Sequence, residues 1–254
     1  MKVVGLIAAM PQEIAPFLRR LGRPEHFKLD IFQAYRFSLF DLDCTLIRSG
    51  VGLERAATAS RALIRATRPE LLVSFGVGGA FLPGLRVGDV IAAEHVGRLE
   101  QAAQAESYLA LAQLSPLAQH AISAALQPQR ASFYPGAIIT TPGSQIVPVL
   151  PAQIANPVLD METAGIAQVA AAEGAVPLLA LRAVSDSVEQ PLPLNLAGLY
   201  DEQQNLRIRR VVGTLLRNPR LLARSVRVSQ NVNRASQNLA VALFEALQHT
   251  DQLY

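Results

Sequence analysis

Three acids follow apolar, strand-like runs of the sequence, at the points where these strands are expected to end. They are Glu13, Glu162 and Asp186, the last preceded by Ser185. Ligands bind at the carboxyl ends of the strands in open α/β sheets, so the three carboxylates are expected to line one crevice. Cleavage of a glycosidic bond needs such a set, because its oxocarbenium-like transition state asks for a proton donor, a nucleophile or activated water, and groups that hold the sugar hydroxyls.

Each acid also has a purely structural interpretation. Glu162 could be an acid that the helix dipole favours at a helix N-terminus. Ser185 and Asp186 could simply cap the turn that follows their strand. Position alone leaves both interpretations open.

The alternation of strand-like and helix-like runs predicts an α/β fold, with a largely parallel sheet covered by helices on both faces. The expected strands are 3–9, 44–50, 71–76, 89–96, 137–140, 157–161 and 177–184, and the expected helices are 11–21, 53–67, 116–126 and 162–173. The segment 31–47 is expected to form a hairpin, because its two strand-like pieces lie too close together for a crossover helix. The segment 157–186 is expected to be one strand–helix–strand crossover that brings Glu162 and Asp186 to the same edge.

Composition excludes several classes of protein. Half of the 254 residues are hydrophobic, which is ample for a core. The single Cys44 rules out a disulfide framework and a Cys-based zinc cluster, and it favours a reducing, cytoplasmic location. No apolar run approaches the roughly 20 residues that cross a bilayer. The four histidines lack ligand spacing, so no metal site is predicted; they are His26, His95, His120 and His249.

Positive charge concentrates near the C-terminus. The arginines between 206 and 240 are Arg207, Arg209, Arg210, Arg217, Arg220, Arg224, Arg227 and Arg234, with no acid among them. Two helices separated by a break near Asn218 and Pro219 are expected there. We expect a basic helical extension, 206–248, packed on or beside a single domain spanning 1–254. It would cover a sheet face or an oligomer interface, or contact anionic lipid at a membrane surface; no nucleic acid is expected as a partner.

Five segments resemble the nucleoside phosphorylase/nucleosidase superfamily, in that family's order. They are MKVVGLIAAMPQEI, SGVGLERAA, SFGVGGAFLPGLRVGDVI, LDMETAGIAQVA and LLALRAVSD, and together they span residues 1–190. The resemblance is greatest to 5′-methylthioadenosine/S-adenosylhomocysteine nucleosidases. It implies a three-layer α-β-α fold with a mixed, largely parallel central sheet, a homodimer or larger assembly, and a small-molecule nucleoside as substrate.

The resemblance also implies a role for each acid. Asp186 matches the acid that protonates purine N7 as the base departs, and Ser185 helps to orient it. Glu162 matches the residue that binds the ribose hydroxyls, and Glu13 the carboxylate that activates water. The other substrate-binding positions that it implies are Met10, Val77, Gly78, Gly79 and Met161.

Hydrolysis is favoured over phosphorolysis, with water as co-substrate and no organic cofactor; a phosphorylase would use phosphate instead. The glycine-rich segment SFGVGGAF carries no arginine to hold a dianion, and it matches neither a dinucleotide fingerprint nor a P-loop. Arg182 lies inside a strand-like run and could pair internally, and Arg55 begins a helix. Glu13 would repel phosphate and suits the activation of water.

Two departures bear on the substrate. The segment TPGSQIVP (141–148) stands where methylthioadenosine nucleosidases carry an aromatic residue that stacks on adenine. The basic extension follows the expected strand 177–184 and Asp186. The extension resembles the hopanoid-associated branch, whose members remove adenine from adenosylhopane. A methylthioadenosine-type or futalosine-type nucleosidase stays open as an alternative, and so does a catalytically silent nucleoside-binding protein.

Overall fold

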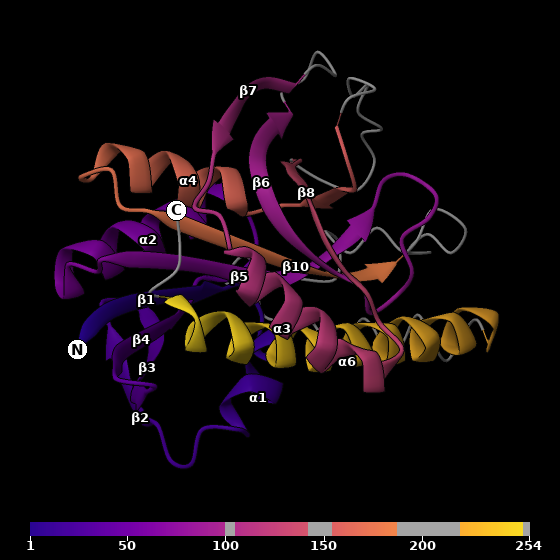
Figure 1. Ribbon diagram of the computed structural model, residues 1–254, viewed down its shortest axis with the longest axis horizontal. Coiled ribbons are helices and arrows are strands. Elements are labelled where there is room, and N and C mark those ends of the chain that lie inside the picture. The colour runs from indigo at the N-terminus through magenta and orange to yellow at the C-terminus, as the bar shows by residue number, and fades with distance from the viewer. Residues whose placement is uncertain (100–104, 142–153, 187–218, 251–254) are drawn as a thin grey trace.

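The computed structural model describes residues 1–99, 105–141, 154–186 and 219–250 (Figure 1). The strands are, in chain order, β1 (Lys2–Ala8), β2 (Glu25–Leu29), β3 (Phe32–Leu39), β4 (Leu42–Arg48), β5 (Leu71–Ala80), β6 (Val90–Leu99), β7 (Ala105–Ala110), β8 (Phe133–Thr140), β9 (Pro157–Asp160) and β10 (Leu178–Asp186). The helices are α1 (Pro11–Leu18), α2 (Leu53–Thr67), α3 (Pro116–Leu126), α4 (Thr163–Ala172) and α6 (Pro219–Gln248), with a 3₁₀ turn at Gln127–Gln129.

The described strands form one mixed sheet. Their order is β10-β6-β8-β9-β5-β1-β4-β3-β2, and β7 pairs with β6. Because β10 also pairs with β5, the strands β5, β10, β6, β8 and β9 close on themselves, and β1, β4, β3 and β2 extend the sheet beyond that ring. Parallel pairs, such as β1 with β5, occur beside antiparallel ones, such as β6 with β10.

Helices cover both faces of this sheet, which confirms the three-layer prediction. Helices α1, α3 and α6 lie on one face, and α2 and α4 lie together on the other (Figure 1). Side chains alternate between the two cores with the period of a strand. Along β5, Leu71, Val73 and Phe75 pack in the core that contains α6, whereas Leu72 packs in the core that contains α2 and α4.

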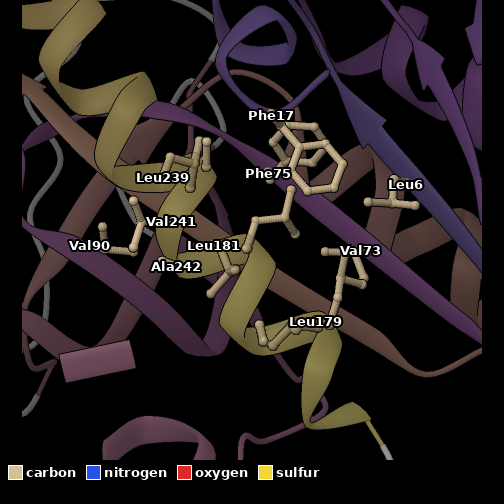
Figure 2. Close-up of a cluster of buried hydrophobic side chains, with 14 of the residues drawn as sticks. Leu6, Phe17, Val73, Phe75, Val90, Leu179, Leu181, Leu239, Val241 and Ala242 are labelled. Carbon is tan, nitrogen blue, oxygen red and sulfur yellow. The ribbon is translucent and has the colours of Figure 1, made fainter. Parts of the chain in front are cut away.

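Helix α6 is a core element over its C-terminal half. Leu239, Val241 and Ala242 lie among side chains of β1, β5 and β10 in the same cluster as Phe17 (Figure 2). The helix begins at Pro219, as expected for a break at that proline; the helix predicted before it lies outside the described residues. Within the described part of the chain, no helix combines the length and apolarity that crossing a membrane requires.

Several local predictions are confirmed and two strands were not foreseen. The helices predicted at 53–67 and 116–126 match α2 and α3 residue for residue. The predicted hairpin is β3 and β4, joined by a two-residue turn whose residues, Phe40 and Asp41, both have positive φ as such turns require. β2 adds a further antiparallel strand to this hairpin, and β7 adds one to β6.

The predicted parallel crossover at 157–186 is wrong. β10 runs parallel to β5, but β9 runs antiparallel to β5, so β9 and β10 have opposite directions. The reason is the closed ring of strands: β9 pairs in parallel with β8, and the ring brings it back against the last residues of β5. The opposite directions of β9 and β10 determine where Glu162 and Asp186 lie.

Candidate active site

The candidate site lies where one edge of β5 changes its partner strand. Along this edge β5 pairs with β1 as far as Ser74, and with β9 from Gly79. Among the described residues, no strand pairs with 75–78 on this edge, so their backbone groups are open to side chains from other elements. Switch points of this kind are where ligands bind in α/β sheets.

Glu13 fills part of this gap from the first turn of α1. Its Oε1 accepts the N–H of Val77 at 2.9 Å. Its Oε2 accepts the N–H groups of Met10 at 2.7 Å and Ala9 at 3.1 Å. Burial raises the pKa of Glu13, while the three amide donors and the charge of Arg182 oppose that rise. The carboxylate is therefore fixed in orientation and made more basic than a carboxylate in water.

Glu162 lies between the end of β9 and the start of α4, and its side chain reaches the same gap. Its Oε1 accepts the N–H of Gly52 at 2.8 Å, and its Oε2 accepts the N–H of Met161 at 3.2 Å. Burial raises the pKa of Glu162 to about 8, and the negative charges of Asp160 and Glu13 add to the rise. This environment favours the protonated form of Glu162 near neutral pH.

The antiparallel direction of β9 explains the position of Glu162. From its pairing with Gly79 and Ala80, β9 runs back along β5, and Glu162 and Gly76 line the same cavity. Glu13 lies against the same glycine, since a methyl group added to Gly76 would lie 2.8 Å from Glu13 Oε1. The two carboxylates therefore share one end of the unpaired stretch.

Between them lies a small polar cavity. Glu13, Glu162 and Arg182 line it together with the hydroxyl-bearing residues Ser49 and Ser74, and its volume is about 10 Å³. One water molecule needs at least about 10–15 Å³ and two to four polar partners. The cavity is thus of the size and polarity that suit a single water held between two carboxyl groups and a guanidinium.

The cation of the cavity is already paired. Arg182 Nη2 lies 2.8 Å from Asp160 Oδ2, with the two side chains 3% and 0% exposed. The same nitrogen donates to Ser74 Oγ at 2.9 Å. Buried charges are stable only when they are paired and hydrogen-bonded in this way. The sequence-based expectation that Arg182 pairs internally is confirmed.

Asp186 lies at the other end of the unpaired stretch. β10 places it opposite Gly79, where an added methyl group would lie 2.7 Å from Asp186 Oδ2. Gly76 and Gly79 are three residues apart, which corresponds to roughly 10 Å along a strand. Asp186 does not line the water-sized cavity. Parallel β10 and antiparallel β9 deliver Asp186 and Glu162 from opposite directions, and the expectation that the three carboxylates line one crevice stays a prediction.

The environment of Asp186 favours its protonated form. Burial raises the pKa of Asp186, and the hydrogen bond from Ser185 opposes the rise. Ser185 Oγ lies 2.7 Å from Asp186 Oδ1 and 3.2 Å from the carbonyl oxygen of Gly78, so it can donate to either. A carboxyl group of this kind can hold a proton and donate it to a ligand.

The glycine-rich segment is part of a strand. β5 continues past the predicted end at 76 to Ala80, so Val77, Gly78 and Gly79 belong to it. Gly78 lets β9 approach, because a methyl group there would lie 2.7 Å from the carbonyl oxygen of Leu159. The glycines thus make room for side chains and backbone.

Of the other predicted positions, Met10 and Met161 contribute N–H groups to Glu13 and Glu162. Sequence reasoning assigned no role to Gly52, although its N–H donates to Glu162, nor to Asp160. A signal for Asp160 was available, because an acid inside the apolar run PVLDM needs a buried partner, and LLALRAV supplies Arg182.

Two sequence-based expectations are not tested by this geometry. Among the described residues, no three His, Cys, Asp or Glu side chains are placed to hold a metal ion, and the lack of a metal stays a prediction. The predicted difference in base contact falls on 141–148, which apart from Thr141 lies outside the described residues.

The chain is similar in sequence to known nucleosidases. The family described as the phosphorylase superfamily matches residues 3–217. The 5′-methylthioadenosine/S-adenosylhomocysteine nucleosidase of Tolumonas auensis is 33% identical over 93 residues, which are 37% of this chain and 40% of that one. The enzyme of the same name from Desulfotalea psychrophila is 30% identical over 105 residues, 41% and 45% of the two chains. These matches span less than half the length of either relative.

Solved structures share the fold over nearly the whole chain. The Neisseria meningitidis 5′-methylthioadenosine/S-adenosylhomocysteine nucleosidase in complex with methylthio-immucillin-A has a TM-score of 0.67 at 20% identity, covering 98% of this chain and 99% of that one. A futalosine hydrolase mutant of Helicobacter pylori has a TM-score of 0.67 at 17% identity, covering 97% and 99%. At these identities the likeness establishes the fold.

Proposed function

The chain belongs to the phosphorylase superfamily, and from that premise we propose that it is an N-glycosyl hydrolase that releases adenine from a 5′-modified adenosine. The observation that carries this proposal is the water-sized cavity between Glu13, Glu162 and Arg182. The names of the curated relatives support the nucleosidase activity and the adenine base.

In the proposed reaction, Glu13 accepts a proton from a water molecule in the cavity as the water oxygen attacks C1′ of the ribose. The C1′–N9 bond breaks, and Asp186 gives its proton to N7 of the departing adenine. The products are adenine and the free 5′-modified ribose, and the proton on Glu13 returns to solvent or to Asp186. Glu162 binds the ribose hydroxyls.

The placement of the two acids beside different residues of β5 is compatible with this division of roles. A water-activating base and an acid for the leaving group act on opposite sides of the sugar, and Glu13 lies against Gly76 while Asp186 lies against Gly79. Burial raises the pKa of both Glu13 and Asp186, which makes Glu13 a stronger base and helps Asp186 to retain the proton that it donates.

Electrostatics favour water over phosphate as the second substrate. Phosphate is a dianion, and the described cavity lining holds two acids and one cation, Arg182, which Asp160 already neutralises. Phosphate has no uncompensated positive charge to bind there. A neutral water molecule meets no such repulsion.

The 5′ group is the finer part of the proposal. A methylthio or homocysteinyl group is supported by the relatives' names, and a futalosine-type substrate by the name of one structural neighbour. An apolar lipid group, as in adenosylhopane, fits the basic segment 206–248, which would favour docking on anionic lipid. We propose the lipid-linked adenosine as the substrate, with the two smaller nucleosides as alternatives.

The test is base release, measured as adenine from methylthioadenosine and from an adenosine with a long apolar 5′ group, and as hypoxanthine from inosine as a base control, each with and without phosphate. We expect release that does not depend on phosphate, with oxygen from ¹⁸O-labelled water found on C1 of the ribose product. Strict dependence on phosphate would show phosphorolysis. No base release from any nucleoside, with binding retained, would show a catalytically silent nucleoside-binding protein.

A single domain, a cytoplasmic location, a homo-oligomeric assembly and peripheral membrane contact stay predictions. Membrane contact is the one that the described surface supports, because Val226 is 50% exposed and the neighbouring Arg227 is exposed as well. Sedimentation with vesicles of anionic lipid, compared with neutral vesicles, tests it.

A further inference from the structure

A buried polar pair lies at the ends of β8 and β9, outside the water-sized cavity. Thr140 and Asp160 are neighbours in the parallel register of these strands and are 1% and 6% exposed. Thr140 Oγ1 donates to Asp160 Oδ1 at 2.6 Å. Neither residue lines the cavity.

The second oxygen of Asp160 gathers donors from two further elements. Arg182 of β10 donates to Oδ2 through Nη2 at 2.8 Å and through Nε at 3.2 Å. Thr163 of α4 donates its N–H to the same oxygen at 3.0 Å, and its hydroxyl as well. One carboxylate oxygen thus fixes both the guanidinium in the cavity wall and the first residue of α4.

This pair also takes over the capping of α4. Glu162 is the N-cap residue, but its side chain makes no capping hydrogen bond. The N–H of Thr163 goes to Asp160, and the N–H of Ala164 goes to Thr140 Oγ1 at 2.9 Å. Because other side chains satisfy these N–H groups, the carboxyl group of Glu162 is free to face the cavity.

We propose that Thr140 and Asp160 are positioning residues, which hold Arg182 and Glu162 in the orientation that the reaction uses. This inference rests on the proposed function for the meaning of that orientation. It goes beyond that function because neither residue reaches the cavity, so both act only through the side chains that they hold.

The same placement gives Asp160 an electrostatic effect on the cavity. The charged groups on the elements around Glu162 are Asp160 of β9, Glu13 of α1, Arg182 of β10 and Arg55 of α2. The charge of Asp160 raises the pKa of Glu162, so removal of that charge lowers the pKa.

The first test is Asp160→Asn, followed by the pH profile of kcat/KM for the nucleoside with the fastest adenine release. Glu162 accepts hydrogen bonds from the ribose hydroxyls as a carboxylate in the proposed reaction, so its titration contributes to the acid limb. We expect that limb to move to lower pH by about 1 unit, a typical effect of one nearby charge. An unmoved limb together with kcat/KM equal to that of the parent chain would overturn the inference.

The second test uses Thr140, because Asp160→Asn leaves Arg182 unpaired and can prevent folding. Thr140→Val keeps the shape of the side chain but removes the hydroxyl, and Thr140→Ser keeps the hydroxyl as a matched control. We expect kcat/KM per folded molecule to fall about 10-fold in the valine variant, the size of one lost hydrogen bond to a charged group. The serine variant should stay within about 2-fold of the parent chain. Equal kcat/KM in the two variants would overturn the inference.

A measurement without turnover separates this inference from the proposed function. The pH dependence of the melting temperature reports the proton on Glu162 whether or not the chain cleaves a nucleoside. The melting temperature is expected to fall as the pH rises from 5 to 8. We expect this fall to be complete at a lower pH in Asp160→Asn. If no nucleoside is cleaved but this shift occurs, the proposed function fails and the positioning of Glu162 stands; if the shift is absent, the inference fails.

Discussion

The two ends of the candidate site hold their acids in different ways. Glu13 and Glu162 each accept N–H groups from rigid backbone, at the start of α1, in β5 and before α2. Among the described residues, the carboxyl group of Asp186 accepts a hydrogen bond from the hydroxyl of Ser185 in the adjacent position. The first end surrounds a cavity of about 10 Å³, and Asp186 does not line that cavity.

The two ends are therefore suited to different tasks. A base that must orient one water gains from a fixed carboxylate, since misplacement of a reacting group by 1 Å costs about 100-fold in rate. An acid that protonates a departing base gains from a side chain with fewer hydrogen bonds and from direct access to the ligand. The contrast therefore predicts that substitutions at the two ends affect activity and stability in different proportions.

Asp186→Asn should have the largest effect on activity with the smallest effect on stability. The amide cannot donate the proton to N7, so kcat should fall by about 10²–10⁴-fold, the usual contribution of general acid catalysis. The amide oxygen can still accept the hydroxyl of Ser185, so the melting temperature should stay within about 2 °C, less than the shift for 1 kcal/mol in a chain of this size. Adenine release and thermal melts check both parts. Near-full activity would remove Asp186 from the mechanism.

Glu13→Gln should lower both activity and stability. The amide cannot accept a proton, and its NH₂ group must face N–H donors that now bond to Glu13. An unsatisfied buried N–H costs about 1–3 kcal/mol, and the melting temperature falls by about 2–4 °C for each kcal/mol. We expect about a 100-fold fall in kcat. A melting temperature equal to that of Asp186→Asn would contradict the difference between the two ends.

Glu162 should make the folded state less stable as the pH rises. Its pKa is about 8 in the folded chain, against 4.5 for an unperturbed glutamate such as that of the unfolded chain. The folded state therefore keeps a proton that the unfolded state releases, so the stabilisation is complete below about pH 4.5 and is lost as the pH rises toward 8. The free energy of unfolding changes by at most about 1.4 kcal/mol per pH unit for one titrating group.

Thermal melts between pH 5 and 8.5 test this prediction, with Glu162→Gln as the comparison. The glutamine cannot ionise, so the slope of melting temperature against pH should become smaller in the variant. Some slope should remain, because Glu13 and Asp186 also have raised pKa values. An unchanged slope would show that Glu162 is ionised in the folded chain.

The sequence predicted the acids and most of the elements, but not how the acids are divided between the two ends. Glu13, Glu162 and Asp186 follow apolar runs, and that local signal made them candidates, whereas the family resemblance implied their roles. Their grouping depends on strand direction, and the antiparallel pairing of β9 with β5 comes from closure of the ring of strands. No local pattern in PVLDM reports that long-range pairing. The acid inside this run does signal a buried partner for Asp160, but it does not say that the partners come from β8, β10 and α4.

Ser185→Ala should have the smallest effect and tests the looser end directly. The hydrogen bond from Ser185 lowers the pKa of Asp186, so its loss should raise that pKa and move the alkaline limb of kcat/KM to higher pH by less than about 1 unit. Activity at neutral pH should fall only several-fold, because the variant keeps the acid and loses one neutral hydrogen bond worth about 1 kcal/mol. Ser185→Thr retains the hydroxyl and should keep the limb in place. A limb that moves to lower pH in the alanine variant would mean that another group, not Asp186, supplies the proton, because the removal of a donor to a carboxylate cannot make that carboxyl group more acidic.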